Sequence, residues 1–238
     1  MKEKVHTYGK CVVIVTAAVF VLLGILYFAP VELPHKIILP VSLLACACFA
    51  MRYRLAAAAF LLSAAGDFMG SLHFFLPQLS FFALSHIMFV MCFVRMLRRP
   101  VCRSAAMKVG VILPAAILHA WLSYPIMLLA VAVVKIIAGI PDISLKIATL
   151  LYALIILMMF LCAVMTRRRT LATGAALFVL SDFVLAWNRF TSPIENAGMI
   201  IMVSYYSAQL LLFIGLCGGV SAGGGNAGMK ENENSRTC

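Results

Sequence analysis

Apolar stretches long enough to cross a bilayer recur from one end of this chain to the other. A helix of about 20 apolar residues, rising about 1.5 Å per residue, spans the ~30 Å hydrocarbon core. Composition agrees with this pattern, since 64% of the residues are hydrophobic, 11% are charged and the mean hydropathy is +1.07. No soluble core could absorb that much apolar surface. The sequence therefore predicts an all-α integral membrane protein.

The apolar stretches predict a bundle of eight transmembrane helices. They cover residues 11–29, 36–50, 55–75, 79–96, 107–137, 145–165, 170–188 and 198–217. The first is too long, and too closely followed by others, for a cleaved signal peptide, so we expect it to be retained. The fifth contains Pro125 and could form one broken helix or two short ones.

Loop charge decides between those two readings of the fifth segment. With one crossing there, the loops on one side hold most of the basic residues, and the other side holds only Lys36, Lys146 and Arg189. A second crossing would move the basic run at 167–169 to the poorer side, against the bias that keeps short basic loops cytoplasmic. We therefore expect a single domain over residues 1–217 in the cell membrane, with both termini cytoplasmic.

The remaining bulk features exclude several classes of function. The net charge of +11 is explained by topology and contact with anionic lipids, so no nucleic-acid partner is expected. The eight cysteines lack CxxC spacing, which gives no reason to expect a metal or another cofactor. Residues 218–238 are glycine-rich and polar and are expected to be a disordered tail.

Two aspartates inside the predicted spans are the most informative residues, because burying an ionisable group in a membrane is costly. Asp67 and Asp182 each lie 12 residues from the cytoplasmic start of their span, or roughly 18 Å along the helix. Both spans run the same way, so the carboxyl groups share one depth. His86, Tyr152 and Tyr205 each lie about 10 Å from the outer boundary, near that depth. The sequence predicts one polar layer in the outer half of the membrane.

Further polar residues share helical faces with this layer or lie beside it. We expect a pocket that is closed on the cytoplasmic side and opens toward the outer leaflet, with two basic residues at its rim. The rim residues are Lys36 and Arg189, and the others are Ser181, Asn188, Tyr206 and Gln209.

The residues alone leave other functions open. The aspartates could be neutral packing groups, the tyrosines interfacial belt residues, and Lys36 and Arg189 interfacial anchors. A proton-coupled transporter of a lipid or small molecule could also use paired aspartates, although the two halves show no convincing repeat. An intramembrane aspartyl protease is disfavoured, because Ala64 breaks the Gly-x-Gly-Asp signature and no Pro-Ala-Leu stands near the C-terminus.

Several of these motifs together resemble one known family. The run Gly174 to Asp182, then Asn188-Arg189-Phe190 and Tyr205-Tyr206 with Gln209, is similar in order and spacing to the YhhN-type lysoplasmalogenases. Gly66-Asp67, His86, Tyr152 and Lys36 fall where that family places a Gly-Asp, a histidine, a tyrosine and a lysine. The resemblance covers residues 36–217, and the longer fifth segment and Gly70-Ser71 depart from it.

The resemblance implies hydrolysis of the vinyl ether of lysoplasmalogens to a fatty aldehyde and glycerophosphoethanolamine or glycerophosphocholine. Vinyl ethers are cleaved by protonation at carbon followed by capture of water, which needs an acid and a base. On this reading Asp67 and Asp182 supply the acid and the base, and Lys36 and Arg189 hold the phosphate, with no metal. Residues that would position water and the ether oxygen are His86, Tyr152, Ser181, Asn188, Tyr205, Tyr206 and Gln209.

Overall fold

The computed structural model describes residues 2–30, 36–98, 127 and 130–218. Within these ranges the chain is helical and contains no strand. Short turns at 51–53, 72–74 and 166–168 join successive helices. The helices are α1 (Lys2–Phe28), α2 (Ile38–Ala50), α3 (Arg54–Ser71), α4 (Phe75–Arg98), the π-helical turn η1 (Ala132–Ile136), α6 (Ile137–Gly139), α7 (Ile143–Met165), α8 (Arg169–Phe190) and α9 (Ala197–Cys217).

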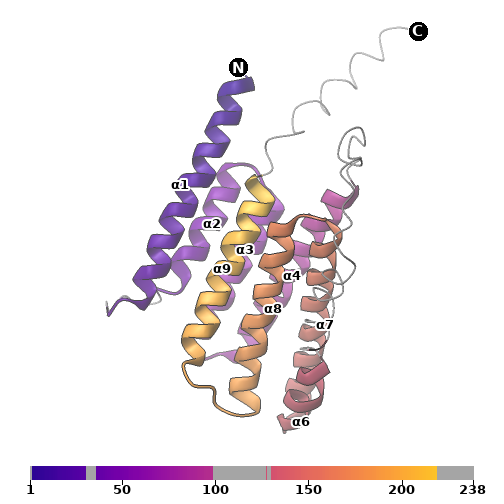
Figure 1. Ribbon diagram of the computed structural model, residues 1–238. Helices are drawn as coiled ribbons and strands as arrows, with labels where there is room; N and C mark the ends of the chain where they lie inside the picture. Colours follow the sequence, from indigo (N-terminus) through magenta and orange to yellow (C-terminus); the bar gives the residue numbers. More distant parts are fainter. Residues whose placement is uncertain (1, 31–35, 99–126, 128–129, 219–238) are drawn as a thin grey trace, which may run out of the picture.

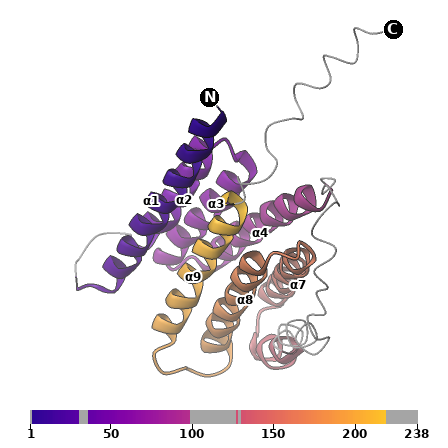
Figure 2. The same cartoon turned by 45° about the horizontal axis from the view of Figure 1, so that its top comes forward.

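The long helices form a closed ring. Each of α1, α2, α3, α4, α7, α8 and α9 packs against the next, and α9 packs back against α1. Helices α2 and α3 also contact α9. Figures 1 and 2 show these helices running along a common direction, with the start of α1 and the end of α9 at the same end of the bundle. Buried side chains from several of these helices meet in the interior of the ring.

Five described helices are long and apolar enough to cross a membrane, namely α1 from Thr7, α4, α7, α8 and α9. Helix α2 has 13 residues and is about 20 Å long, short of the ~30 Å core. Most of the fifth predicted span, and the predicted tail beyond residue 218, lie outside the described residues. A multi-pass membrane fold is supported, while eight crossings and cytoplasmic termini stay predictions.

The turn between α3 and α4 lies earlier than hydropathy indicates. The predicted spans were 55–75 and 79–96, whereas α3 ends at Ser71 and α4 begins at Phe75. His73 has a φ of 63°, and the amides of His73 and Phe74 donate to the carbonyls of Gly70 and Met69. This left-handed cap ends α3 inside an apolar stretch, which is why hydropathy misses it.

Aromatic packing closes the interior at the Arg52 end of the bundle. The Phe60 ring lies 5.3 Å from that of Phe89 and 6.2 Å from that of Phe213, and all three side chains are fully buried. Helices α8 and α9 approach closely beside them, since a Cβ at Gly174 would lie 3.1 Å from the Ala208 carbonyl oxygen. Small residues at such crossings are typical of membrane helix pairs.

Candidate active site

Asp67 and Asp182 each accept a hydrogen bond from a tyrosine on another helix. The Tyr205 hydroxyl of α9 donates to Oδ2 of Asp67 on α3 at 2.9 Å. The Tyr152 hydroxyl of α7 donates to Oδ2 of Asp182 on α8 at 2.5 Å. Asp67 is 3% exposed and the Asp182 side chain 15% exposed, so the two carboxyl groups differ in their access to the interior space.

His86 extends the Asp182 group into a three-residue network. Its Nε2 lies 3.1 Å from the Tyr152 hydroxyl and 3.7 Å from Oδ2 of Asp182. The imidazole is fully buried, and Nδ1 has no hydrogen-bond partner among the described residues. Because the Tyr152 hydroxyl donates its own hydrogen to the carboxyl group, the hydroxyl oxygen is available to accept a hydrogen bond from the N–H of His86 Nε2. Helices α4, α7 and α8 are thus joined at one point.

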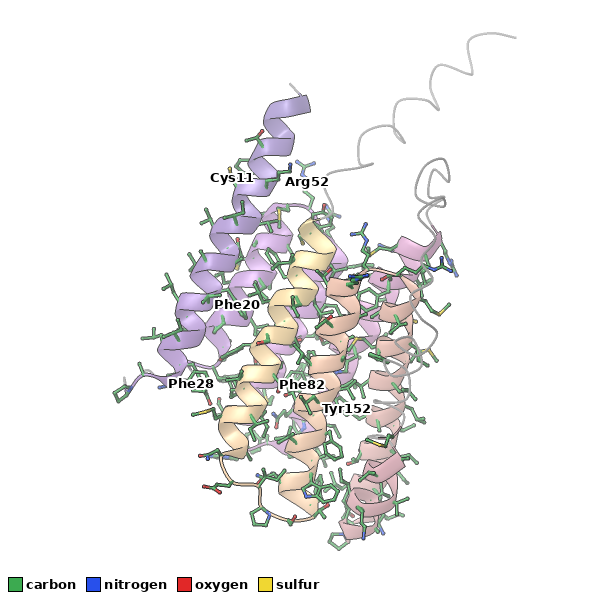
Figure 3. All side chains as sticks on the ribbon, viewed as in Figure 1. Cys11, Phe20, Phe28, Arg52, Phe82 and Tyr152 are labelled. Carbon is green, nitrogen blue, oxygen red and sulfur yellow. The ribbon has the colours of Figure 1, made fainter. Side chains whose placement is uncertain are left out.

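Aromatic rings pack around the two polar groups. Phe178 lies edge-to-face against His86 and Tyr205, with centroid distances of 4.6 Å and 5.3 Å. Phe82 packs against Tyr205 at 5.8 Å. Figure 3 shows Phe82 and Tyr152 in the half of the bundle away from Arg52. These rings place apolar surface around His86 and Tyr205, and hydrogen bonds are stronger in such surroundings than in water.

Both aspartates line one cavity of about 400 Å³. Helices α3, α4, α8 and α9 supply most of its wall, and α1 and the segment before α2 supply the rest. The cavity therefore brings together residues that are more than 100 positions apart in the chain. Its polar lining among the described residues comprises Lys36, Asp67, Ser71, Gln78, Ser181 and Asp182, together with Tyr27 and Tyr205.

A second, narrower pocket of about 80 Å³ adjoins this cavity. Its wall is almost entirely apolar and comes from α4, α7 and α8 with Ile136 and Ile137. Four residues line both spaces, so the polar cavity and the apolar pocket meet at a common junction. These residues are Gln78, Phe82, Asp182 and Leu185.

The two predicted rim cations occupy different places. Lys36 lines the polar cavity, where Nζ donates to the Ala29 carbonyl at 2.9 Å and lies 5.7 Å from the centre of the Tyr27 ring. Arg189 is exposed and does not line that cavity. Its guanidinium stacks 4.2 Å from the centre of the Phe75 ring, which lines the apolar pocket.

Comparison with known proteins identifies the family of this chain. The chain matches the YhhN family over residues 6–216 of its 238. The chain belongs to the YhhN family.

The chain is 44% identical over 72 residues to human lysoplasmalogenase TMEM86B, and this match covers 30% of each chain. It is 54% identical over 39 residues to the pig protein of the same name, covering 16% of this chain and 17% of that one. The chain thus matches less than a third of these relatives' length. No solved structure matches it.

Four other residues of this YhhN chain were predicted from the sequence. Three of them form a hydrogen bond with a backbone group, and the fourth is buried and does not line the cavity. Ser181 lines the cavity and donates to the Ile201 carbonyl at 3.2 Å. The Tyr206 hydroxyl donates to the Ile37 carbonyl at 3.1 Å rather than to a carboxyl group. The Asn188 side chain accepts from the Ile194 amide. Gln209 is fully buried one turn from Tyr205, and its amide has no hydrogen-bond partner among the described residues.

Three polar residues that line the cavity were not predicted as site residues from the sequence, namely Tyr27, Ser71 and Gln78. Gln78 lies one residue before the predicted fourth span, 79–96. The helical spacing of Gln78, Phe82 and His86 was the available signal, because residues four apart share a face. Among the described residues no three His, Cys, Asp or Glu side chains gather closely enough to hold a metal ion.

Proposed function

We propose that this chain is a lysoplasmalogenase, which hydrolyses the vinyl ether of a lysoplasmalogen to a fatty aldehyde and glycerophosphoethanolamine or glycerophosphocholine. One observation carries the proposal: Asp67 and Asp182 line the same cavity inside the helical ring of a YhhN-family chain. The names of the TMEM86B relatives supply the substrate class. The substrate is amphiphilic, and the site offers one polar and one apolar space.

The two adjoining spaces suit the two halves of that substrate. The apolar pocket would take the first part of the alkenyl chain, and the polar cavity would take the glycerol and phosphate. Among the described residues, Lys36 is the cation that lines the polar cavity, and we assign the phosphate contact to it. Arg189 stacks on Phe75 at the edge of the apolar pocket and would meet the phosphate only from outside the cavity. The vinyl ether then lies at the junction of the two spaces.

Position suggests which carboxyl group does which step. Asp182 lines both spaces, so it faces the alkenyl carbon on the chain side of the ether, and we assign it the role of general acid. Its proton goes to the β-carbon of the vinyl ether, and the α-carbon and oxygen become an oxocarbenium ion. Asp67 lines only the polar cavity, where it would accept a proton from the attacking water.

The remaining steps balance without another reactant. Water adds to the α-carbon and gives a hemiacetal, which then collapses to the aldehyde. The glycerol oxygen leaves with the proton that Asp67 received, and the hemiacetal hydroxyl proton returns to Asp182. Tyr205 and Tyr152 each keep one oxygen of a carboxyl group hydrogen-bonded and leave the other for proton transfer.

The test compares purified wild-type protein with Asp67→Asn and Asp182→Asn. Each protein is given a 1-alkenyl lysolipid and the matched 1-acyl lysolipid, and aldehyde and fatty acid are measured separately. We expect the wild type to release aldehyde and no fatty acid. Each variant should release aldehyde about 10²- to 10⁴-fold more slowly, the usual range for a general acid or base.

Asp142→Asn is the matched control for these variants. Asp142 is exposed and caps α7 by accepting the Leu145 amide at 2.8 Å, and asparagine caps helices as well as aspartate. Its activity should equal that of the wild type. Fatty acid without aldehyde would refute the vinyl ether as the target bond. Wild-type rates in both cavity variants would remove the aspartates from the mechanism.

A further inference from the structure

Gln78 lies at the junction of the polar cavity and the apolar pocket, where the polar and apolar halves of an amphiphile would meet. Of the four described residues that line both spaces, Phe82 and Leu185 are apolar and Asp182 is the proposed acid. Gln78 is the remaining polar side chain at that junction. It comes from the first turn of α4, whereas Asp182 comes from α8. An uncharged hydrogen-bonding group therefore faces the junction from a helix other than the acid's.

The Gln78 amide lies directly against α3 at Gly70. A Cβ added at Gly70 would come within 2.6 Å of Nε2 and 2.9 Å of Cδ of Gln78, so the amide rests directly over the glycine. Gly70 lies three residues after Asp67, on the same face of α3, and both line the polar cavity. The absence of a side chain at position 70 is what gives the amide room.

The structure of a lysoplasmalogen determines what would meet this amide. The vinyl ether oxygen is carried by the first glycerol carbon, and the neighbouring carbon carries a free hydroxyl at the sn-2 position. With the vinyl ether beside Asp182, that hydroxyl falls at the same junction, on the side of the polar cavity. An amide offers both a donor and an acceptor, so it can accept from a hydroxyl and donate to it.

We propose that Gln78 binds the sn-2 hydroxyl of the lysolipid and thereby selects lipids in which that position is free. The inference rests on the proposed function and assigns a substrate contact within it. An esterified sn-2 position has no proton to donate to the amide carbonyl. It also brings a second chain to a junction whose adjoining apolar pocket measures about 80 Å³. Gly70 contributes by leaving space for the amide.

The experiment combines a change in the enzyme with a change in the substrate. Wild-type protein and Gln78→Leu are each assayed for aldehyde release from a lysoplasmalogen and from its 2-deoxy analogue, which lacks only the sn-2 hydroxyl. We expect wild-type kcat/KM to fall about 3- to 10-fold with the analogue, as for loss of one neutral hydrogen bond. Gln78→Leu should show the same loss with the natural substrate, mostly in KM, and no further loss with the analogue.

A second variant covers the case in which Gln78→Leu does not fold. Gly70→Ala keeps the glutamine but places a methyl group where the amide lies, so it should remove the same discrimination between the two substrates. Equal losses on both substrates in either variant would show a packing effect and overturn the inference. So would full discrimination in both variants. A wild-type protein that releases no aldehyde would instead overturn the proposed function, and this inference with it.

Discussion

Removing single hydroxyl groups from three tyrosines should distinguish tyrosines that support the proposed reaction from one that only stabilises the fold. Tyr152→Phe deletes the oxygen that donates to Asp182 and lies 3.1 Å from His86 Nε2. Tyr205→Phe deletes the donor to Asp67 at 2.9 Å. Tyr206→Phe deletes a donor to the Ile37 backbone carbonyl. The three changes remove the same atom from buried rings, so differences between them report on the partner that is lost.

The expected loss of kcat depends on the hydrogen-bond partner that each hydroxyl group leaves behind. A hydrogen bond to an ionised group contributes about 1.5–3 kcal/mol, and each 1.4 kcal/mol is a factor of about ten in rate. Asp182, the proposed acid, becomes ionised as it gives up its proton, and Tyr152→Phe also removes the hydroxyl beside His86 Nε2. We therefore expect Tyr152→Phe to lower kcat by about 10- to 150-fold. Tyr205→Phe should lower kcat by about tenfold. Tyr206→Phe loses a neutral bond of about 0.5–1.5 kcal/mol, which should reduce stability and change kcat by less than about threefold.

The assay is aldehyde release by detergent-purified protein, with thermal unfolding of each variant measured in parallel. Phenylalanine preserves the ring packing, so all three variants should remain folded. Parallel losses of activity and of unfolding temperature across the three would mean that the hydroxyl groups act through packing alone. Wild-type kcat in Tyr152→Phe would contradict the role given to the network of His86, Tyr152 and Asp182.

Three further substitutions test the fold and the cavity. Gly174→Ala should destabilise the protein by about 1–3 kcal/mol and lower its unfolding temperature, because the new Cβ would lie 3.1 Å from backbone atoms of α9. Ser63→Ala should cost about 0.5–1.5 kcal/mol, because it removes the 2.7 Å bond to Ser85 while Ser85 still donates to the Ala59 carbonyl at 2.8 Å. The double Ser63→Ala, Ser85→Ala variant should cost less than the sum of the single changes in a denaturation cycle. Lys36→Gln should raise KM about 3- to 10-fold with kcat unchanged, whereas an equal fall in kcat would argue against a simple phosphate contact.

Depth in the bundle was predicted from the constant helical rise and from the direction that the basic loops favour for each span. Those two facts placed Asp67, His86, Tyr152, Asp182 and Tyr205 at one level before any contact was known. The structure groups the same residues into two hydrogen-bonded sets. Their catalytic roles stay a proposal, since hydrogen bonding alone does not distinguish a site from a structural network.

Rotation about the helix axis was not predictable in the same way. Tyr205 and Tyr206 differ in depth by about 1.5 Å but in direction by about 100°. The first reaches Asp67 on α3, and the second reaches the backbone before α2. Which face of α9 points inward depends on the packing of the other helices. The pattern of apolar residues in α9 alone does not predict that face.

The pairs that define the cavity also hold the ring together. Asp67 and Tyr205 join α3 to α9 across the interior, and the network from His86 through Tyr152 to Asp182 joins α4, α7 and α8. In lipid, apolar packing between helices gains little over contact with hydrocarbon chains, so polar bonds of this kind contribute a larger share of helix association. A change at either carboxyl group should therefore act on helix packing as well as on chemistry. For this reason the unfolding temperature must be measured beside the activity of every variant of Asp67 and Asp182.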